Sequence, residues 1–202
     1  MRPPQSDPLR AAGVVLAAGP SRRMALGGSK MLLALEGEAL ARRAARRALG
    51  AGLSPVVVVL GRDAEGVRAT LVGLDCDCVV NPDFEGPTST SLHHGLRRLA
   101  ATTEAAVILL GDMVHVSEEM IARLVGAAQE SDAPLVVSRY GNVTAPPLLF
   151  RRALFGELLA WRGEGCGKAV VQRHGDEAVF LDWPADRLAD VDTPEDFQRL
   201  GA

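Results

Sequence analysis

A basic, glycine-containing loop follows the first apolar run of the chain, within the stretch VVLAAGPSRRMALGGSK from Val14 to Lys30. The small residues at its start would let backbone N–H groups approach a ligand closely; they follow Leu16 and are Ala17, Ala18 and Gly19. The later part carries donors and positive charges, on Ser21, Arg22, Arg23 and Lys30. Arginine and lysine both suit a phosphate. The pattern favours an anion site, with a flexible basic surface loop as the alternative.

An aspartate follows a second apolar run directly. Asp112 ends the stretch AAVILLGD, where a carboxylate either caps a helix or binds a cation. Ser117 already suits the cap of the following helix, so we favour the cation. Mg²⁺ needs only one or two carboxylates besides phosphate oxygens and water. Asp190 or Asp192 would supply a second ligand; they lie two residues apart, so an extended backbone points both the same way, and the pattern does not separate them.

Apolar runs alternate with helical patterns along the chain. Strands are expected over residues 13–19, 55–61, 76–81, 105–112 and 133–140, and helices over 38–52, 63–73, 117–131, 151–162 and 193–201, with another from Ser89. Runs of Val, Ile and Leu without polar alternation are typical of strands that are covered on both faces. The pattern predicts an α/β fold with a doubly wound, mostly parallel sheet between two layers of helices.

In such sheets, ligands bind beyond the carboxyl ends of the strands. We therefore expect the functional residues in four segments that follow strands: residues 17–30, 81–91, 111–115 and 140–147.

The composition sets the broad class of protein. The hydrophobic fraction of 48% excludes a disordered chain, and no apolar run has the length of a membrane span. The net charge of −3 gives no general attraction to nucleic acid. We expect a disordered tail over residues 1–10, a single domain over 11–202 and, without a secretory signal, a cytoplasmic location.

Four arginines lie together in the first expected helix: Arg42, Arg43, Arg46 and Arg47. Their spacing places them on one face, opposite the apolar residues. This pattern favours a solvated helix face, with a nucleic-acid patch as the alternative.

The three cysteines are Cys76, Cys78 and Cys166. An odd number without a secretory signal favours reduced thiols. Cys76 and Cys78 have the spacing of half a metal site but no second pair, so we interpret them as small buried apolar residues.

Four stretches resemble, in order, the motifs of the molybdopterin guanylyl- and cytidylyltransferase superfamily of nucleotidyltransferases. They are LAAGPSRRM with a lysine after it, NPDFEGPTSTSLHHGL, VILLGDM and DVDTPEDF. The resemblance implies a Rossmann-like fold and transfer of a nucleoside monophosphate from an NTP. It implies that Arg23, Lys30 and Asp112 are catalytic, and that Asp112 binds Mg²⁺, or Mn²⁺ in its place, together with Asp192 or Asp190. The residues implied to bind the nucleotide are Leu16, Ala17, Ala18, Gly19, Ser21, Arg23, Lys30, Asn81, Gly86 and Ser91.

The sequence Leu-Ala-Ala-Gly is similar to the cytidylyl branch of that superfamily, because the guanylyl branch typically reads Leu-Ala-Gly-Gly. The resemblance thus implies CTP as the nucleotide and molybdopterin as the acceptor, with Glu164 and Lys168 of GEGCGK on the acceptor side. A phosphate monoester is already ionised near neutral pH, so its attack would need no general base. A molybdoenzyme or a chaperone is an expected partner, whereas nucleic acid and membranes are not.

Three features depart from the family pattern. The spacer ALGGS before Lys30 is longer than usual, Ala145-Pro146-Pro147 stands where the cytidylyl branch has Gly-His-Pro, and Cys166 replaces a glycine. The last two lie on the acceptor side. Two alternatives therefore stay open: a phosphorylated sugar or alditol as the acceptor, or a non-enzymatic assembly factor for a molybdenum hydroxylase.

Overall fold

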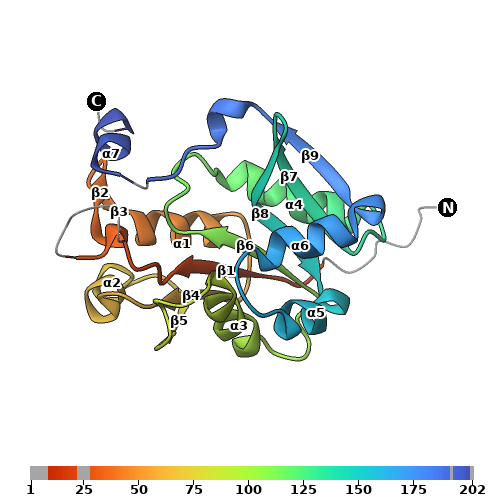
Figure 1. Cartoon of the computed structure of the whole chain (residues 1–202), viewed down its shortest axis with the longest axis horizontal. Helices are drawn as coiled ribbons and strands as arrows, with labels where there is room; N and C mark the ends of the chain where they lie inside the picture. The colour runs from red at the N-terminus through yellow and green to blue at the C-terminus, as the bar shows by residue number, and fades with distance from the viewer. Residues whose placement is uncertain (1–8, 22–27, 192, 201–202) are drawn as a thin grey trace.

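The computed structural model describes residues 9–21, 28–191 and 193–200, and Figure 1 shows a central sheet with helices on both faces. The sheet has seven strands in the order β5-β4-β1-β6-β8-β7-β9. Only β8 is antiparallel to its neighbours, β6 and β7. The expected mostly parallel, three-layer α/β fold is confirmed. The strands are β1 (Ala11–Ala17), β4 (Val56–Leu60), β5 (Asp77–Val80), β6 (Ala105–Leu110), β7 (Leu135–Tyr140), β8 (Val143–Arg151) and β9 (Val179–Trp183).

Seven α-helices connect or flank these strands in the described residues. They are α1 (Leu40–Gly50), α2 (Ala64–Thr70), α3 (Thr88–Arg98), α4 (Glu118–Gln129), α5 (Phe155–Ala160), α6 (Cys166–Arg173) and α7 (Pro194–Leu200). A 3-10 turn, η2 (Lys30–Leu32), precedes a two-stranded hairpin of β2 (Ala34–Leu35) and β3 (Glu38–Ala39). Further 3-10 turns are η3 (Arg152–Leu154), η4 (Gly175–Glu177) and η5 (Ala185–Arg187).

The side chains of β1 alternate between two apolar cores. Val15 and Ala17 face the core formed with α1, α2 and α4, whereas Val14, Leu16 and Ala18 belong to the core formed with α3, α5 and α6. In Figure 1, α1 and α3 lie on opposite sides of β1. Because every residue of β1 is buried, both faces of the strand are covered, as its unbroken apolar sequence predicts.

Two strands of the main sheet, and both strands of the β2–β3 hairpin, were not expected from the sequence. Residues 143–147 begin β8 instead of forming a loop, and the helix expected over 151–162 is reduced to η3 and α5. The pairing of β7 with β8 shifts in register between Val137 and Arg139, and the paired residues of β8 resume at Thr144 and Leu148. Pro146 and Pro147 lie in the interval, where their missing N–H groups cost no hydrogen bond of this ladder. Prolines at this point hid the strand. The short β9 was missed as well.

The expectation that the arginines of α1 form a solvated face is wrong. Arg42 donates to the carbonyls of Thr70 and Val72, and Arg43 donates to the Leu35 carbonyl. Arg46, the one exposed member, pairs with Glu38 and Glu118. Arg47 donates to the carbonyls of Val114 and Val116 at 2.6 and 2.8 Å. Charge-assisted hydrogen bonds to backbone oxygens thus fasten α1 to the neighbouring loops.

The cysteines are all free thiols. Cys166 is buried, and Cys76 and Cys78 are half-buried against the core beside β5. Burial raises the pKa of the Cys76 and Cys166 thiols to about 11. Thiols with such pKa values stay protonated near neutral pH and are poor nucleophiles, in keeping with the interpretation of small buried residues.

Residues 1–8 of the expected tail lie outside the described part of the chain. Leu9 packs against the core, and the Arg10 N–H donates to Glu104 Oε2 at 2.9 Å. In the described residues no helix combines the length and the apolar character that crossing a membrane requires.

Candidate active site

A buried ion pair joins the carboxyl ends of two adjacent central strands. Lys30 begins η2, beyond β1, and Asp112 follows β6. The Lys30 ammonium contacts Asp112 Oδ2, and the two side chains are only 11% and 13% exposed. Burying two charges costs desolvation free energy, and the attraction between them offsets little more than this cost. The ion pair is therefore weak evidence that these residues stabilise the fold. Its place at the end of parallel strands makes it a strong candidate for binding a ligand instead.

The backbone around this pair is tightly fixed. The Lys30 N–H donates to Ser21 Oγ at 2.9 Å, and Ser29 Oγ accepts from the Met31 N–H at the start of η2. Gly111 lies against η2, because a Cβ atom there would stand 2.6 Å from Met31 Sδ. A larger residue at this position would require the Met31 side chain to move, so glycine lets the Asp112 turn pack against η2 without that change.

The ion pair lines a cavity of about 210 Å³, which we call the first cavity. Six of the predicted nucleotide-binding residues line it: Leu16, Ala18, Gly19, Lys30, Gly86 and Ser91. Asp112, Pro20, Met31, Phe84, Thr88 and Leu110 complete the lining. The expected loops after β1, β5 and β6 therefore converge on one hollow.

Three other predicted nucleotide-binding residues do not line this cavity. Ala17 faces the opposite core, and the Ser21 hydroxyl accepts from the Lys30 backbone. Asn81 is fully buried, and its Nδ2 donates to Thr90 and Ser91 at 2.9 Å each. Asn81 thus holds the start of α3 in place. Any contact of these three residues with a nucleotide stays a prediction.

A second cavity, of about 220 Å³, adjoins the first, and the two share Leu16, Thr88 and Leu110. Its walls are mainly apolar, with Ile108, Leu148 and Phe150 from β6 and β8. Lys168, predicted on the acceptor side, lines it. So do Ala145, Pro146 and Cys166, the residues at which the sequence departs from the family pattern.

Glu164, the other predicted acceptor residue, lines neither cavity but is next to Gly165, which lines the second one. Its Oε2 accepts from the Thr88 N–H, at the first residue of α3, at 3.2 Å. The contact is exposed, and it ties the GEGCGK segment to the helix that borders both cavities.

The C-terminal segment runs beside Asp112. Met113 and Asp190 form an isolated bridge, and the Val191 N–H donates to the Asp112 carbonyl at 3.2 Å. Val191 packs with Leu35 of the hairpin and Val114, which fixes the segment there. Asp190 lines a separate hollow with Asp196 and Arg199, not the first cavity.

Two predicted site residues, Arg23 and Asp192, lie outside the described residues. In the part of the chain that is described, no three His, Cys, Asp or Glu side chains gather as a metal cluster. Asp112 supplies a hard oxygen ligand, which suits Mg²⁺ if water and phosphate oxygens fill most of its coordination sphere.

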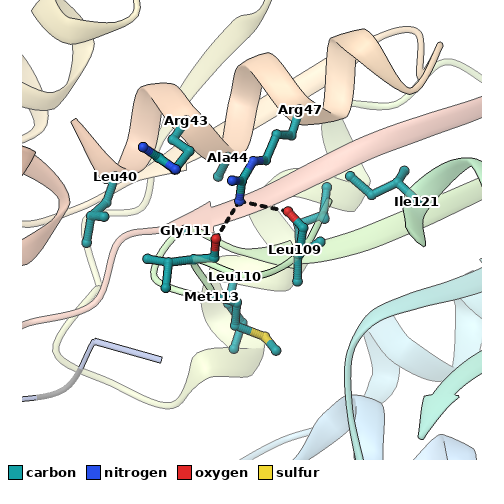
Figure 2. Close-up of a pocket in the computed structure, with 11 residues that line it drawn as sticks. Leu40, Arg43, Ala44, Arg47, Leu109, Leu110, Gly111, Met113 and Ile121 are labelled. Carbon is teal, nitrogen blue, oxygen red and sulfur yellow. Dashed lines mark hydrogen bonds between the residues drawn. The ribbon is translucent and has the colours of Figure 1, made fainter. Parts of the chain in front are cut away.

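A third hollow, behind the Asp112 turn, is a packing feature. Figure 2 shows Arg47 reaching from α1 toward the loop after β6, with two hydrogen bonds to backbone oxygens. The hollow measures about 10 Å³, the room of one water molecule at most. Burial and the neighbouring Arg43 and Arg46 lower the pKa of Arg47. Through its two hydrogen bonds, Arg47 holds the loop that carries Asp112. The hollow beside Arg47 is too small for a ligand.

The comparison with known families shows to which family the chain belongs. Residues 13–178 match the model of the MobA-like NTP transferase domain. The chain belongs to this family. It is a nucleotidyltransferase, and the expected family resemblance is confirmed; the matched residues contain the first three of the four motifs.

Two relatives of this MobA-like NTP transferase match different shares of its length. Purine catabolism protein PucB of Bacillus subtilis is 29% identical over 200 residues, which cover 93% of this chain and 94% of PucB. Bifunctional protein GlmU of Sorangium cellulosum is 34% identical over 140 residues, 66% of this chain but only 29% of GlmU.

The solved structure of Rv0371c from Mycobacterium tuberculosis superimposes with a TM-score of 0.84 at 29% identity, covering 96% of this chain and 98% of that one. A manganese complex of Rv0371c gives a TM-score of 0.76 at 27% identity, covering 96% and 98%. Molybdopterin-guanine dinucleotide biosynthesis protein A from Archaeoglobus fulgidus shares the fold, with a TM-score of 0.63 at 16% identity, covering 94% and 96%.

The sequence reasoning overlooked two parts of the site. Thr88 borders both cavities; it lies in the expected segment 81–91 but was not named as a site residue, because nothing in its local pattern distinguishes it. The turn after β4, residues 61–63, contacts the basic loop, and the rule that ligands lie beyond strand ends would have marked it had it been applied to β4.

Proposed function

We propose that the protein transfers CMP from CTP to the phosphate of molybdopterin and releases pyrophosphate, with Mg²⁺ as its metal. The observation that carries the proposal is the buried Lys30–Asp112 pair in a cavity that adjoins a second, mainly apolar one. One cavity suits the nucleotide and the other suits the acceptor.

The reaction would depend on alignment and charge. An ionised oxygen of the acceptor phosphate attacks the α-phosphorus of the NTP, and the bond from that phosphorus to the β-phosphate oxygen breaks. Lys30, with Arg23, would neutralise the charge that gathers on the phosphates. Asp112, with Asp190 or Asp192, would hold the metal, which supplies Lewis-acid stabilisation of the leaving pyrophosphate. The manganese complex of Rv0371c supports a divalent cation and makes Mn²⁺ the alternative.

The preference for CTP rests on Ala18. Of the two alanines in the loop, Ala18 lines the first cavity, while Ala17 faces the other core. Ala18 is 2% exposed and packs in the core formed with α3, α5 and α6, so its methyl group belongs to the wall between that core and the first cavity. We infer that this methyl favours the smaller pyrimidine over a purine.

The acceptor is the less constrained half of the proposal. Apolar walls with Lys168 and Thr88 at the border suit a flat heterocycle that carries a phosphate, as molybdopterin does. We include in the proposal a molybdoenzyme or chaperone as the protein partner. The free thiols support a cytoplasmic location, in keeping with the expectation from the sequence.

Pyrophosphate release tests the proposal. Purified protein is given CTP or GTP with Mg²⁺ or Mn²⁺, and with molybdopterin, a sugar or alditol phosphate, or no acceptor. We expect release only with molybdopterin, and faster with CTP. Release with the sugar or alditol phosphate instead would establish that alternative acceptor, and no release with any acceptor would favour the assembly factor.

A further inference from the structure

We propose that the turn Gly61-Arg62-Asp63, at the carboxyl end of β4, positions the basic loop so that Lys30 is held ready for the triphosphate. The inference rests on the proposed function only in taking the loop from Leu16 to Lys30 as the nucleotide loop. It assigns positioning residues to a turn that lines neither cavity in the described residues.

The first contact is a close approach of two backbones. A Cβ atom at Gly61 would stand 2.4 Å from the Ala18 carbonyl oxygen, 2.9 Å from Ala18 Cα and 2.5 Å from Phe84 Cβ. No side chain fits there, so the backbone of the turn after β4 is in direct contact with Ala18, the loop residue that lines the first cavity.

The second contact holds the loop at Pro20, two residues after Ala18. Arg62 Nη1 donates to the Pro20 carbonyl at 3.1 Å, and the Arg62 N–H lies 3.5 Å from the Ala18 carbonyl. The Arg62 guanidinium thus fixes the N-terminal part of the loop to the turn.

The third contact holds the C-terminal end of the loop, at Ser29. Asp63 Oδ2 accepts a hydrogen bond from the Ser29 N–H at 2.5 Å, one residue before Lys30. Asp63 occupies the N-cap position of α2, where an aspartate ordinarily bonds to its own helix, yet it makes no side-chain cap there. Its backbone is left-handed, with φ of 53° and ψ of 40°, a strained conformation that aspartate tolerates better than most residues. The carboxylate therefore serves the loop and not the helix.

The two anchors lie on either side of the loop. Pro20 is held by Arg62 and Ser29 by Asp63, while the Lys30 N–H bonds to Ser21 Oγ between them. The position of Lys30 against Asp112 thus depends on a turn from a third strand. Because Pro20, Ser29 and Lys30 are already held in place, these residues lose less entropy when a triphosphate binds.

Nucleotide binding by calorimetry tests the inference, with CTP and GTP titrated in the presence of Mg²⁺. Asp63→Gly removes the carboxylate but keeps a residue that accepts the left-handed backbone. Asp63→Asn keeps an oxygen acceptor and also tolerates that backbone. Asp75→Gly, an exposed aspartate in the turn before β5, is the matched control, and Lys30→Ala reports whether the loop binds nucleotide at all.

We expect Asp63→Gly to raise the Kd for CTP about tenfold, since a hydrogen bond to a charged acceptor is lost. Asp63→Asn should stay within about threefold and Asp75→Gly should equal the wild type. In turnover, Asp63→Gly should raise KM for CTP and lower kcat by less than Lys30→Ala does, because Lys30 is displaced but not removed, and the unfolding temperature should match that of Asp75→Gly. A general loss of structure would instead lower the unfolding temperature and kcat together.

Three results would overturn the inference. If Lys30→Ala weakens binding and Asp63→Gly does not, the proposed function stands and the positioning role is wrong. If Asp63→Asn binds as weakly as Asp63→Gly, the acceptor oxygen is not what matters. If the wild type binds neither nucleotide, or Lys30→Ala has no effect, the loop is not the nucleotide loop and both proposals fail.

Discussion

Asp112 and Lys30 are buried together with opposite charges, so replacing one alters the surroundings of the other. Asp112→Asn keeps the size of the side chain and an oxygen for the Lys30 ammonium, which should preserve the fold. It removes the negative charge expected to bind the metal. Turnover should fall about a hundred- to several-thousand-fold, the equivalent of about 3 to 5 kcal/mol of transition-state stabilisation.

Pyrophosphate release and circular dichroism, measured on the same preparation, check this prediction. A well-folded Asp112→Asn variant with nearly normal transfer would show that Asp112 is not the metal ligand.

Ala18 gives a prediction about base selection. Ala18→Gly should shift the preference from CTP toward GTP, because it opens room beside the first cavity for the second ring of a purine. Each buried hydrogen-bonding group that a wrong base leaves unpaired costs on the order of 1–3 kcal/mol, so the shift should be visible in kcat/KM. The two nucleotides are compared in the wild type and the variant. Equal use of both by the wild type, or a preference for GTP, contradicts the role of Ala18.

At the scale of elements, α1 stabilises the loop after β6 through Arg47. Arg47→Met keeps most of the apolar stem and deprives the carbonyls of Val114 and Val116 of their donor. We expect the free energy of unfolding to fall by about 2 kcal/mol, measured by urea denaturation. The control is Arg46→Ala on the exposed side of the same helix, whose ion pairs should contribute less than about 1 kcal/mol. If both variants lose the same free energy of unfolding, the hydrogen bonds from Arg47 to the backbone contribute no more to stability than the exposed ion pairs of Arg46.

The junction of α5, α6 and η4 should respond to pH. His174 Nε2 lies 2.8 Å from Glu157 and its Nδ1 lies 3.1 Å from Glu177, and these hydrogen bonds raise the pKa of His174 above its ordinary value of 6.5. Because the folded pKa is the higher one, the stabilisation is complete below the unfolded pKa and is lost as the pH rises through the folded pKa.

The variant His174→Gln should therefore be less stable than the wild type at about pH 5.5, and the difference should shrink as the pH is raised past neutrality. Unfolding free energies measured across this range check the sign. A difference that grows with pH would mean that the neutral imidazole is the stabilising form.

The elements also show what the sequence could and could not reveal. Unbroken apolar runs identified β1, β4 and β6, because a strand covered on both faces needs no polar residue. The start of α4 was predicted from Ser117, whose side chain does accept from the Met120 N–H. The antiparallel β8 was not predicted, since Pro146 and Pro147 look like a loop until the register shift is seen.

The site shows a similar division. Lys30 and Asp112 were both predicted, from their places beyond strand ends and from the family motifs, but their direct contact only becomes visible in the folded chain. Asp63 was missed because an aspartate just before a helix looks like an ordinary N-cap. That it bonds to Ser29, far away in the sequence, only becomes visible in the folded chain.

At the scale of the whole molecule, three strand ends meet at one edge of the sheet. The loop after β1 supplies Lys30, the turn after β4 holds that loop, and the turn after β6 supplies Asp112. The C-terminal segment closes this edge, since Val191 packs with the hairpin that follows η2. The first and second cavities adjoin here, so a donor and an acceptor of the transferred group would lie side by side.

Following the α-phosphate of the nucleotide tests this account most directly. CTP labelled at the α-phosphate is incubated with the protein, Mg²⁺ and molybdopterin, and the label and the pyrophosphate are both quantified. The account predicts that the label appears in the acceptor, one for each pyrophosphate released, and that Asp112→Asn lowers the rates of both by at least about a hundredfold. Label that stays in CTP, or that is released as free CMP without entering the acceptor, would contradict nucleotidyl transfer at this site.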